Sequence, residues 1–394
     1  MHRSRASIRD LAAAIRDRTE SPVALTEWCL ERVLDANPRL NAFITVTADL
    51  ARDQAREAER EIATGRWRGP LHGVSVAVKD FYDTAGVRTT AGASMFANRV
   101  PTEDAVMVER LRVAGAVLVG KTNMHRLGMG TTSLESDFGP VVNPLSARHV
   151  AGGSSGGSAA ALAAGLCFAT IDTDAVGSGR LPAAICGVTC FKPTFGVLSG
   201  EGILAGEPAD PAILKLSHPS VMARTADDVA LAFAAVTGRA DAGERSLGPM
   251  RVGVVSSFAG TDETRRVFDA ALVALAALEV ETRPVTVPFG SATFDVSHID
   301  ADRESINASL FRDVEALVLP TLAAPAPTVE DARARGSLAV APDNTFFCNY
   351  YGLPAITVPA GKDADGLPLG IQFVGPRGAD DRVLALARAY ERGV

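Results

Sequence analysis

A run of glycine and serine, Gly152–Ser158, opens directly into the alanine-rich segment Ala159–Ala164 near the middle of the chain. Such a loop gathers backbone N–H groups and hydroxyls at a helix N-terminus, where the helix dipole favours negative charge. A flexible linker is not expected here, because the run lies within an apolar stretch that is rich in predicted strands and helices. The run is therefore a candidate site for an anion or an oxyanion.

Apolar runs of strand length alternate along the chain with segments of helical periodicity. The pattern predicts helices at 7–36 (two, separated at Ser21-Pro22), 49–64, 106–114, 226–237, 262–278 and 380–392, and strands at 73–79, 116–119, 251–255, 316–320 and 355–359. This alternation predicts an α/β fold. No linker divides the chain, so we expect a single domain over residues 1–394, with a helical hairpin at about 7–37.

Composition excludes several function classes. The chain has 394 residues and a net charge of −7, and its lysines and arginines form no dense block, so we expect no nucleic-acid partner. Its five scattered cysteines fit reduced thiols in the cytoplasm, and Cys186 and Cys190, the one close pair, make a poor metal site. Neither a signal peptide nor an apolar stretch of bilayer length is found, so we expect no membrane association. We also expect no metal and no cofactor.

Two other interpretations of the glycine-serine run can be weighed from its residues. A phosphate-binding loop fails, because Ser158 and Ala159 stand where lysine and serine or threonine are needed. The nucleophile elbow of α/β-hydrolases fits the pattern around Ser154 or Ser155, with His218 or His298 as the base. That motif needs a strand just before the serine, and the preceding segment is polar and interrupted by proline. The elbow remains a minor alternative.

A second serine-bearing turn follows the small-residue helix. It reads Thr-Asp-x-x-Gly-Ser-x-Arg-x-Pro-Ala-Ala over residues 173–184, and Ser178 lies 24 positions after Ser154. Together with the glycine-serine run and Val78-Lys79-Asp80, this turn closely resembles the amidase signature family, including the spacing of its two catalytic serines. Further family-like segments are found at 120–124, 138–144, 191–194, 222–225 and 352–359. The resemblance covers nearly the whole chain, with a signature core at about 70–200.

The resemblance implies a single large domain built on a mostly mixed, twisted β-sheet that helices cover on both faces. It also implies a Ser-cisSer-Lys triad: Ser178 is the nucleophile that becomes acylated, Ser154 bridges on a cis peptide bond, and Lys79 is the general base. A serine hydroxyl needs a base to take its proton, and lysine can do so only when it is neutral. Burial lowers the pKa of a lysine, and the apolar residues before Lys79 could supply that setting. The plain alternative is a solvated lysine and a helix-capping Ser178.

The resemblance further places the oxyanion hole at the backbone N–H groups of Ala175, Val176, Gly177 and Ser178. Val176 departs from the family, which usually has glycine at this position, and a β-branched residue narrows the backbone there. Ser155 is expected to shape the loop that holds Ser154.

Two charged residues flank the nucleophile. Asp174 and Arg180 are expected to form a structural ion pair that fixes the turn. A role for Arg180 in binding a substrate carboxylate is the alternative.

The function that the resemblance implies is hydrolysis of a small carboxamide or urea-like substrate to a carboxylate and ammonia or an amine. With Gly179, the sequence Ser178-Gly179-Arg180 is similar to the Ser-Gly-Arg of allophanate hydrolases. The stretch 224–352 is short for the family, which suggests a small substrate or an open site. One alternative is the glutaminase-type A subunit of a tRNA-dependent amidotransferase, and another is a binding protein on an inactive amidase fold. The expected partner is a small-molecule amide, and a homodimer is left open.

Overall fold

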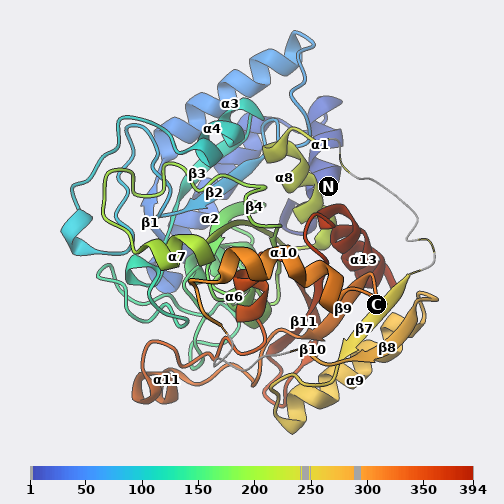
Figure 1. The fold of residues 1–394 in the computed structure, drawn as a ribbon. Coiled ribbons are helices and arrows are strands. Elements are labelled where there is room, and N and C mark those ends of the chain that lie inside the picture. Colours follow the sequence, from blue (N-terminus) through green and yellow to red (C-terminus); the bar gives the residue numbers. More distant parts are fainter. Residues whose placement is uncertain (1–2, 240, 242–247, 249, 288–293, 394) are drawn as a thin grey trace.

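The computed structural model describes residues 3–239, 241, 248, 250–287 and 294–393 (Figure 1). Its strands are β1 (Phe43–Val46), β2 (Ser75–Lys79), β3 (Val117–Thr122), β4 (Ala169–Asp174), β5 (Thr189–Lys192), β6 (His218–Ala223), β7 (Arg251–Val255), β8 (Glu281–Val285), β9 (Ala316–Pro320), β10 (Ala355–Lys362) and β11 (Pro368–Val374). Within this described part of the chain they form one sheet in the order β1-β3-β2-β4-β6-β5-β10-β11-β9-β7-β8. Parallel pairs, such as β2 with β4, and antiparallel pairs, such as β4 with β6, occur side by side.

The helices are α1 (Ile8–Arg16), α2 (Pro22–Leu40), α3 (Ala48–Ala63), α4 (Val106–Val113), α5 (Gly156–Ala163), α6 (Arg180–Cys186), α7 (Pro211–Leu216), α8 (Ala226–Thr237), α9 (Asp262–Ala276), α10 (Ile299–Leu310), α11 (Val329–Arg335), α12 (Phe346–Tyr350) and α13 (Asp380–Gly393). Ser21 caps α2 and Pro22 occupies its first turn, at the break that the sequence predicts, and Ser7 caps α1. None of the helices in the described ranges has both the length and the apolar character that a bilayer crossing requires.

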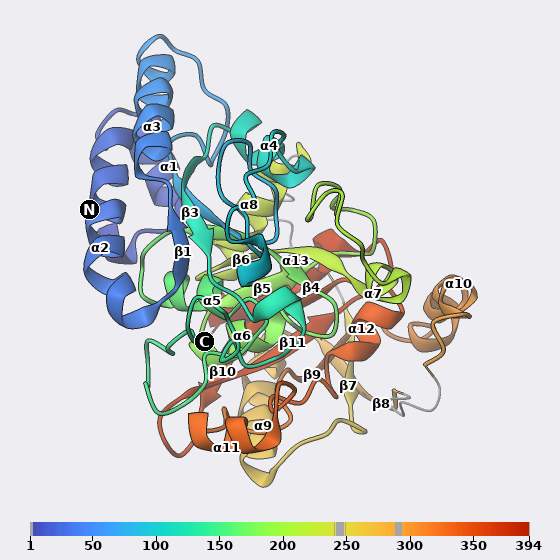
Figure 2. The same cartoon turned by 90° about the vertical axis from the view of Figure 1, so that its left-hand side faces the viewer.

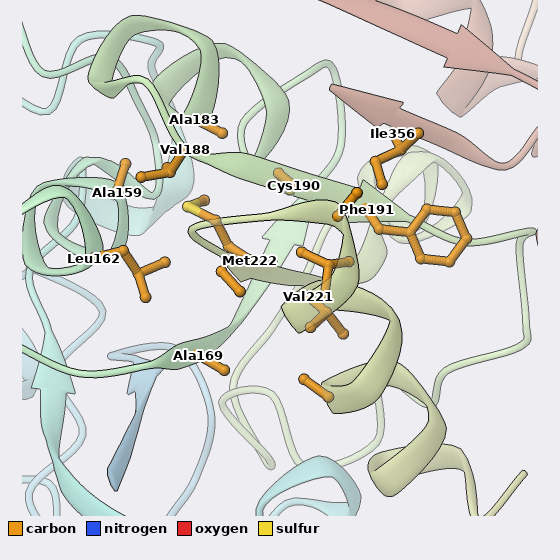
Figure 3. Close-up of a cluster of buried hydrophobic side chains, with 14 of the residues drawn as sticks. Ala159, Leu162, Ala169, Ala183, Val188, Cys190, Phe191, Val221, Met222 and Ile356 are labelled. Carbon is orange, nitrogen blue, oxygen red and sulfur yellow. The ribbon is translucent and has the colours of Figure 1, made fainter. Parts of the chain in front are cut away.

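Helices cover both faces of the sheet. Near its centre, α5 and α6 pack on one face, whereas α8, α9 and α13 form a layer on the other (Figure 2). Alternate residues of the central strands supply the two cores: Cys190 and Met222 lie toward α5 and α6, while Phe191 and Val221 lie toward α8 (Figure 3). The predicted α/β fold, a single large domain with a mixed sheet between helices, is confirmed.

The small residues of α5 explain how close this helix lies to the sheet. A Cβ atom added at Gly157 would lie 2.2 Å from the backbone oxygen of Asn123, which follows β3. The first residues of α5 therefore contact the ends of the strands directly.

The structure differs from the sequence prediction in several strands. Residues 120–122 continue β3, where a loop was expected. The reason is that Lys121 is satisfied inside the protein: its Nζ atom donates to the Tyr82 carbonyl and to Thr89 Oγ1, both at 2.6 Å. The strand β6 was not predicted, since Pro219 interrupts its apolar pattern. The strands β1, β4, β5, β8 and β11 were also absent from the prediction.

The arrangement of β2 and β4 positions the candidate residues. These neighbouring strands are parallel, with Val78 opposite Ile171, so their carboxyl ends lie at the same edge of the sheet. Lys79 ends β2, and Asp174 ends β4 just before the turn that carries Ser178.

Candidate active site

Lys79 is fully buried at the end of β2. Its Nζ atom donates to Ser154 Oγ at 2.6 Å and to Thr173 Oγ1 at 2.9 Å. Burial lowers the pKa of Lys79 to about 8, against the opposing effect of the Asp172 and Asp174 carboxylates. A lysine with this pKa is partly neutral near neutral pH, which a general base requires. The solvated strand-end lysine considered from the sequence is not what the structure contains.

Ser154 lies next to Lys79, and the peptide bond between Gly153 and Ser154 is cis. The Ser154 carbonyl accepts hydrogen bonds from the His125 N–H at 3.0 Å and from Ser133 Oγ at 3.3 Å. A Cβ atom at Gly153 would lie 2.8 Å from the Ser133 nitrogen, so only glycine fits there. The segment around residues 125–133 therefore holds the Ser154 peptide in place.

Ser178 lies on the turn between β4 and α6, with 4% of its surface exposed. Its hydroxyl donates to the Thr173 carbonyl at 3.0 Å, and the Ser155 N–H donates to the Ser178 carbonyl at 3.0 Å. Ser178 does not cap α6, because Gly179 holds the cap position. The two serine turns thus meet at Thr173, although within the described residues no hydrogen bond joins the Ser154 and Ser178 hydroxyls.

A fully buried ion pair fixes the turn. Arg180 Nε donates to Asp174 Oδ2 and Arg180 Nη2 to Asp174 Oδ1, both at 3.0 Å. The remaining guanidinium bonds go to Gln372 Oε1, the Thr345 carbonyl and Asn349 Oδ1. Burial alone would raise the pKa of Asp174, but Arg180 holds it below its ordinary value. With Arg180 fully buried and committed to these partners, the geometry does not favour a substrate-carboxylate role.

The backbone donors of the turn are not equivalent. The Gly177 N–H donates to Asp174 Oδ1 at 2.8 Å, so this predicted member of the oxyanion hole already has a carboxylate partner. The Ala175 N–H points at Ser178 Oγ across 3.4 Å. In the described structure, the N–H groups of Val176 and Ser178 make no hydrogen bond. The donors available to an oxyanion are therefore those of Ala175, Val176 and Ser178.

Val176 fits this backbone without difficulty. It is absent from the residues whose φ is positive, whereas Gly177 has φ +124°. A Cβ atom at Gly177 would lie 2.2 Å from Thr345 Oγ1, and the same hydroxyl donates to the Val176 carbonyl at 2.6 Å. The need for glycine in this turn therefore falls on position 177 and not on 176.

Gly179 has a packing reason that is unrelated to substrate. A Cβ atom there would lie 2.9 Å from both Cys190 Sγ and Ser220 Oγ. This packing is sufficient by itself to account for glycine at position 179.

The nucleophile-elbow alternative has no support in the geometry. Residues 143–150 form no strand, only isolated bridges at Val150 and His149. The buried His218 ring binds the Leu216 carbonyl through Nδ1, while His298 is exposed and lies near Asp295. Within the described residues, neither imidazole hydrogen-bonds to Ser154 or Ser155.

Sequence reasoning missed four residues that complete the site: Thr173, Thr345, Asn349 and Gln372. Thr173 stands inside the recognised turn, directly before Asp174, and this position is the one signal that could have identified it. The other three come from α12, its N-cap and β11, far along the chain.

Comparison with known proteins finds sequence matches along nearly the whole chain. The family model described as Amidase matches residues 24–297 and 294–384. The A subunit of the glutamyl-tRNA(Gln) amidotransferase of Methylococcus capsulatus is 32% identical over 484 positions, covering 100% of this chain and 97% of the relative. The mitochondrial A subunit of the same amidotransferase in Ixodes scapularis is 32% identical over 493 positions, covering 98% and 95%.

Solved structures agree with the sequence comparison. A crystal structure of an amidase is 29% identical with a TM-score of 0.86, covering 98% of this chain and 99% of that one. The peptide amidase of Stenotrophomonas maltophilia is 26% identical with a TM-score of 0.84, covering 98% and 96%.

Proposed function

The chain belongs to the amidase family and is an enzyme that acts on carbon–nitrogen bonds, and from this premise we propose that it hydrolyses a small amide through an acyl-enzyme on Ser178. The observation that carries the proposal is the hydrogen bond from the buried Lys79 amine to Ser154, beside the turn of Ser178. A buried lysine of lowered pKa next to a chain of hydroxyls is the arrangement that activates a serine.

The proposed acylation moves one proton along this chain. Neutral Lys79 accepts the proton of Ser154 Oγ, and Ser154 takes the proton of Ser178, whose hydroxyl turns from the Thr173 carbonyl toward Ser154. Ser178 Oγ attacks the substrate carbonyl, and the N–H groups of Ala175, Val176 and Ser178 bind the oxyanion. The proton returns through Ser154 to the leaving nitrogen as the carbon–nitrogen bond breaks. Water then hydrolyses the ester along the same route and releases the carboxylate.

The relatives favour a second candidate, the glutamine-hydrolysing A subunit of an amidotransferase that acts on tRNA. Two such A-subunit relatives are 32% identical over nearly the whole chain, and this supports the second candidate more directly than the stand-alone amidase. Their alignments extend over 484 and 493 positions against 394 residues here, so the relatives carry segments that this chain lacks. The small-amide proposal rests on that shorter form and on the structural matches to amidases.

Ammonia release separates the candidates. The purified chain is assayed with primary amides, ureas, hydrazides and glutamine, alongside Ser178→Ala and Ser155→Ala. We expect release from small amides by the chain alone, loss of release and of fluorophosphonate labelling in Ser178→Ala, and labelling retained in Ser155→Ala.

Release from glutamine alone, together with a larger co-purifying partner, would support the amidotransferase candidate instead. Labelling that persists in Ser178→Ala and disappears in Ser155→Ala would overturn the assignment of the nucleophile. The absence of release from every compound would revive the inactive binding protein.

A further inference from the structure

The strand β4 carries a second buried carboxylate that the proposed reaction does not use. Asp172 is fully buried, and its Oδ2 atom accepts a hydrogen bond from Thr170 Oγ1 at 2.5 Å. No described residue forms a hydrogen bond to its other oxygen, Oδ1. A buried carboxylate oxygen without a donor is costly, so a role for it has to be sought in its surroundings.

The sheet register places Asp172 beside the base. In the parallel pair of β2 and β4, Val78 lies opposite Ile171, and the next position in this register brings Lys79 alongside Asp172. Across the antiparallel pair, Ser220 of β6 lies opposite Asp172. Asp172 therefore occupies the place on the neighbouring strand that is next to the amine-bearing residue.

The other groups around Lys79 leave its charge uncompensated. Asp174 is committed to the ion pair with Arg180. Cys190 of β5 and the buried imidazole of His125 also face Lys79, but burial raises the pKa of the thiol and lowers that of the imidazole, so both are neutral near pH 7. Among the groups that act on Lys79 in the described structure, Asp172 is the carboxylate without a cationic partner of its own.

We propose that Asp172 is a positioning residue for the reaction, which balances the positive charge that Lys79 acquires when it takes the proton of Ser154. This proposal rests on the proposed function, because it needs Lys79 as the base. An ammonium group in an apolar interior is unstable unless an opposite charge lies near it. Asp172 thus makes Lys79 basic enough to hold the proton, at the cost that Lys79 becomes neutral only at higher pH.

Burial and the neighbouring polar groups act on the pKa of Asp172 in opposite directions. Burial raises the pKa of Asp172, whereas the hydroxyls of Ser158 and Thr170 and the Lys79 amine lower it. Ser155, the N-cap of the helix α5 that contains Ser158, also lowers it. The Tyr82 hydroxyl donates to the Asp172 carbonyl at 2.6 Å and leaves the side chain to Lys79.

The test measures how fast a fluorophosphonate probe labels Ser178 as a function of pH, which needs no knowledge of the substrate. The full chain is compared with Asp172→Asn, which keeps the shape and removes the charge. We expect the midpoint of the acid limb to move to lower pH by about one unit. The labelling rate on the plateau falls about tenfold, because Lys79 is then a weaker base.

Asp228→Asn is the matched control. Asp228 is also a buried carboxylate, but it accepts a hydrogen bond from the Ile8 N–H at the start of α1, away from Lys79. This variant should leave the midpoint unchanged. An acid limb that stays in place or moves to higher pH in folded Asp172→Asn would overturn the proposal.

Two further variants separate the possible failures. In Lys79→Met the labelling should be lost, and if it persists, the proposed function fails together with the role of Asp172. If labelling is lost but Asp172→Asn keeps the wild-type midpoint, only the role of Asp172 fails. Should Asp172→Asn not fold, Thr170→Val decides: it removes the donor to Oδ2 and should move the midpoint downward by less, and an unmoved midpoint contradicts the proposal.

Discussion

The Nζ atom of Lys79 lies 2.6 Å from Ser154 Oγ, although the two residues are 75 positions apart in the chain. The end of β2 and the loop before α5 make this contact. Because the amine touches Ser154 and not Ser178, the serine on the cis peptide bond is the group through which a proton would pass. The predicted effect of each substitution near Lys79 depends on this order of groups, from Lys79 to Ser154 to Ser178.

The first prediction concerns pH. Burial lowers the pKa of Lys79 to about 8, so the amine is protonated below that pH and neutral above it. Activity should therefore rise about tenfold per pH unit below pH 8 and level off above it. The pH profile of kcat/KM for ammonia release measures this limb, and a flat profile from acid to alkaline pH would contradict it.

The second prediction concerns removal of the Lys79 amine. Lys79→Ala should lower kcat/KM by about 10²- to 10⁴-fold, the range that general-base catalysis contributes. A variant of another buried lysine, Lys121→Met, is the control, because Lys121 binds the Tyr82 carbonyl and Thr89 and not a serine of the site. Full activity in Lys79→Ala would remove the base from the mechanism.

The next prediction concerns Thr173, whose hydroxyl accepts a hydrogen bond from Lys79 Nζ at 2.9 Å. Thr173→Val keeps the shape and loses this acceptor, so we expect kcat to fall by about tenfold or more, as for a hydrogen bond to a charged group. Thr173→Ser restores the hydroxyl and should recover most of the rate. Full activity in Thr173→Val together with a loss in Thr173→Ser would show that the methyl group, and not the hydroxyl, is what matters.

Arg180→Met tests the buried ion pair. The change leaves Asp174 charged and buried without its guanidinium, so the free energy of unfolding should fall by about 3–5 kcal/mol. Urea denaturation monitored by circular dichroism measures it. Arg16→Met, at an exposed arginine beside Asp17, should change stability by less than about 0.5 kcal/mol.

The same pair predicts how stability depends on pH. The pKa of Asp174 lies below its ordinary value, so its contribution is complete above the unfolded pKa of about 4 and is lost as the pH falls through the folded value. In Arg180→Met, burial without the guanidinium raises the pKa of Asp174 instead, so the variant loses stability as the pH rises above about 4 and toward that raised pKa. The stability difference between the wild type and Arg180→Met should therefore grow as the pH rises, and a difference that shrinks would contradict the ion pair.

The last prediction asks what Gly179 is for. In Gly179→Ala the added methyl group meets Cys190 Sγ and Ser220 Oγ, and we expect a loss of about 1–3 kcal/mol in the free energy of unfolding. The same change in a chain that also carries Cys190→Ala and Ser220→Ala should cost much less. Gly200→Ala, where the nearest atom is 3.8 Å away, is the control. A changed KM with unchanged stability would instead indicate that Gly179 affects substrate binding.

The sequence predicted Lys79 as the base through the resemblance of Val78-Lys79-Asp80 and the two serine turns to the amidase signature family. It could not distinguish that lysine physically from Lys121 and Lys192, which are equally buried and lie on central strands. Burial lowers the pKa of Lys121 to about 8 and that of Lys192 to about 7, so titration alone does not identify the base either. What separates Lys79 is its hydrogen bond to Ser154, which is a tertiary contact.

Local sequence patterns could not predict the residues around Ser178 either, because their contacts are also tertiary. Arg180 binds side chains up to 192 positions away, and no periodicity links such residues. Strand β6 was missed because its proline argued against a central strand, although tertiary pairing with β4 and β5 on both sides holds it there. Val176 seemed out of place from the sequence, yet its backbone does not need glycine.

The bonds from Arg180 to Thr345, Asn349 and Gln372 also affect when the protein becomes active during its synthesis. Lys79, Ser154 and Ser178 all leave the ribosome before any of these three residues does. Until Gln372 has emerged and β11 has joined the sheet, the Arg180 guanidinium lacks the neutral partners that offset the free-energy cost of burying its charge. We therefore expect a nascent chain that carries Lys79, Ser154 and Ser178 but not yet Gln372 to be inactive, and hydrolysis to begin only when the final strands are in place.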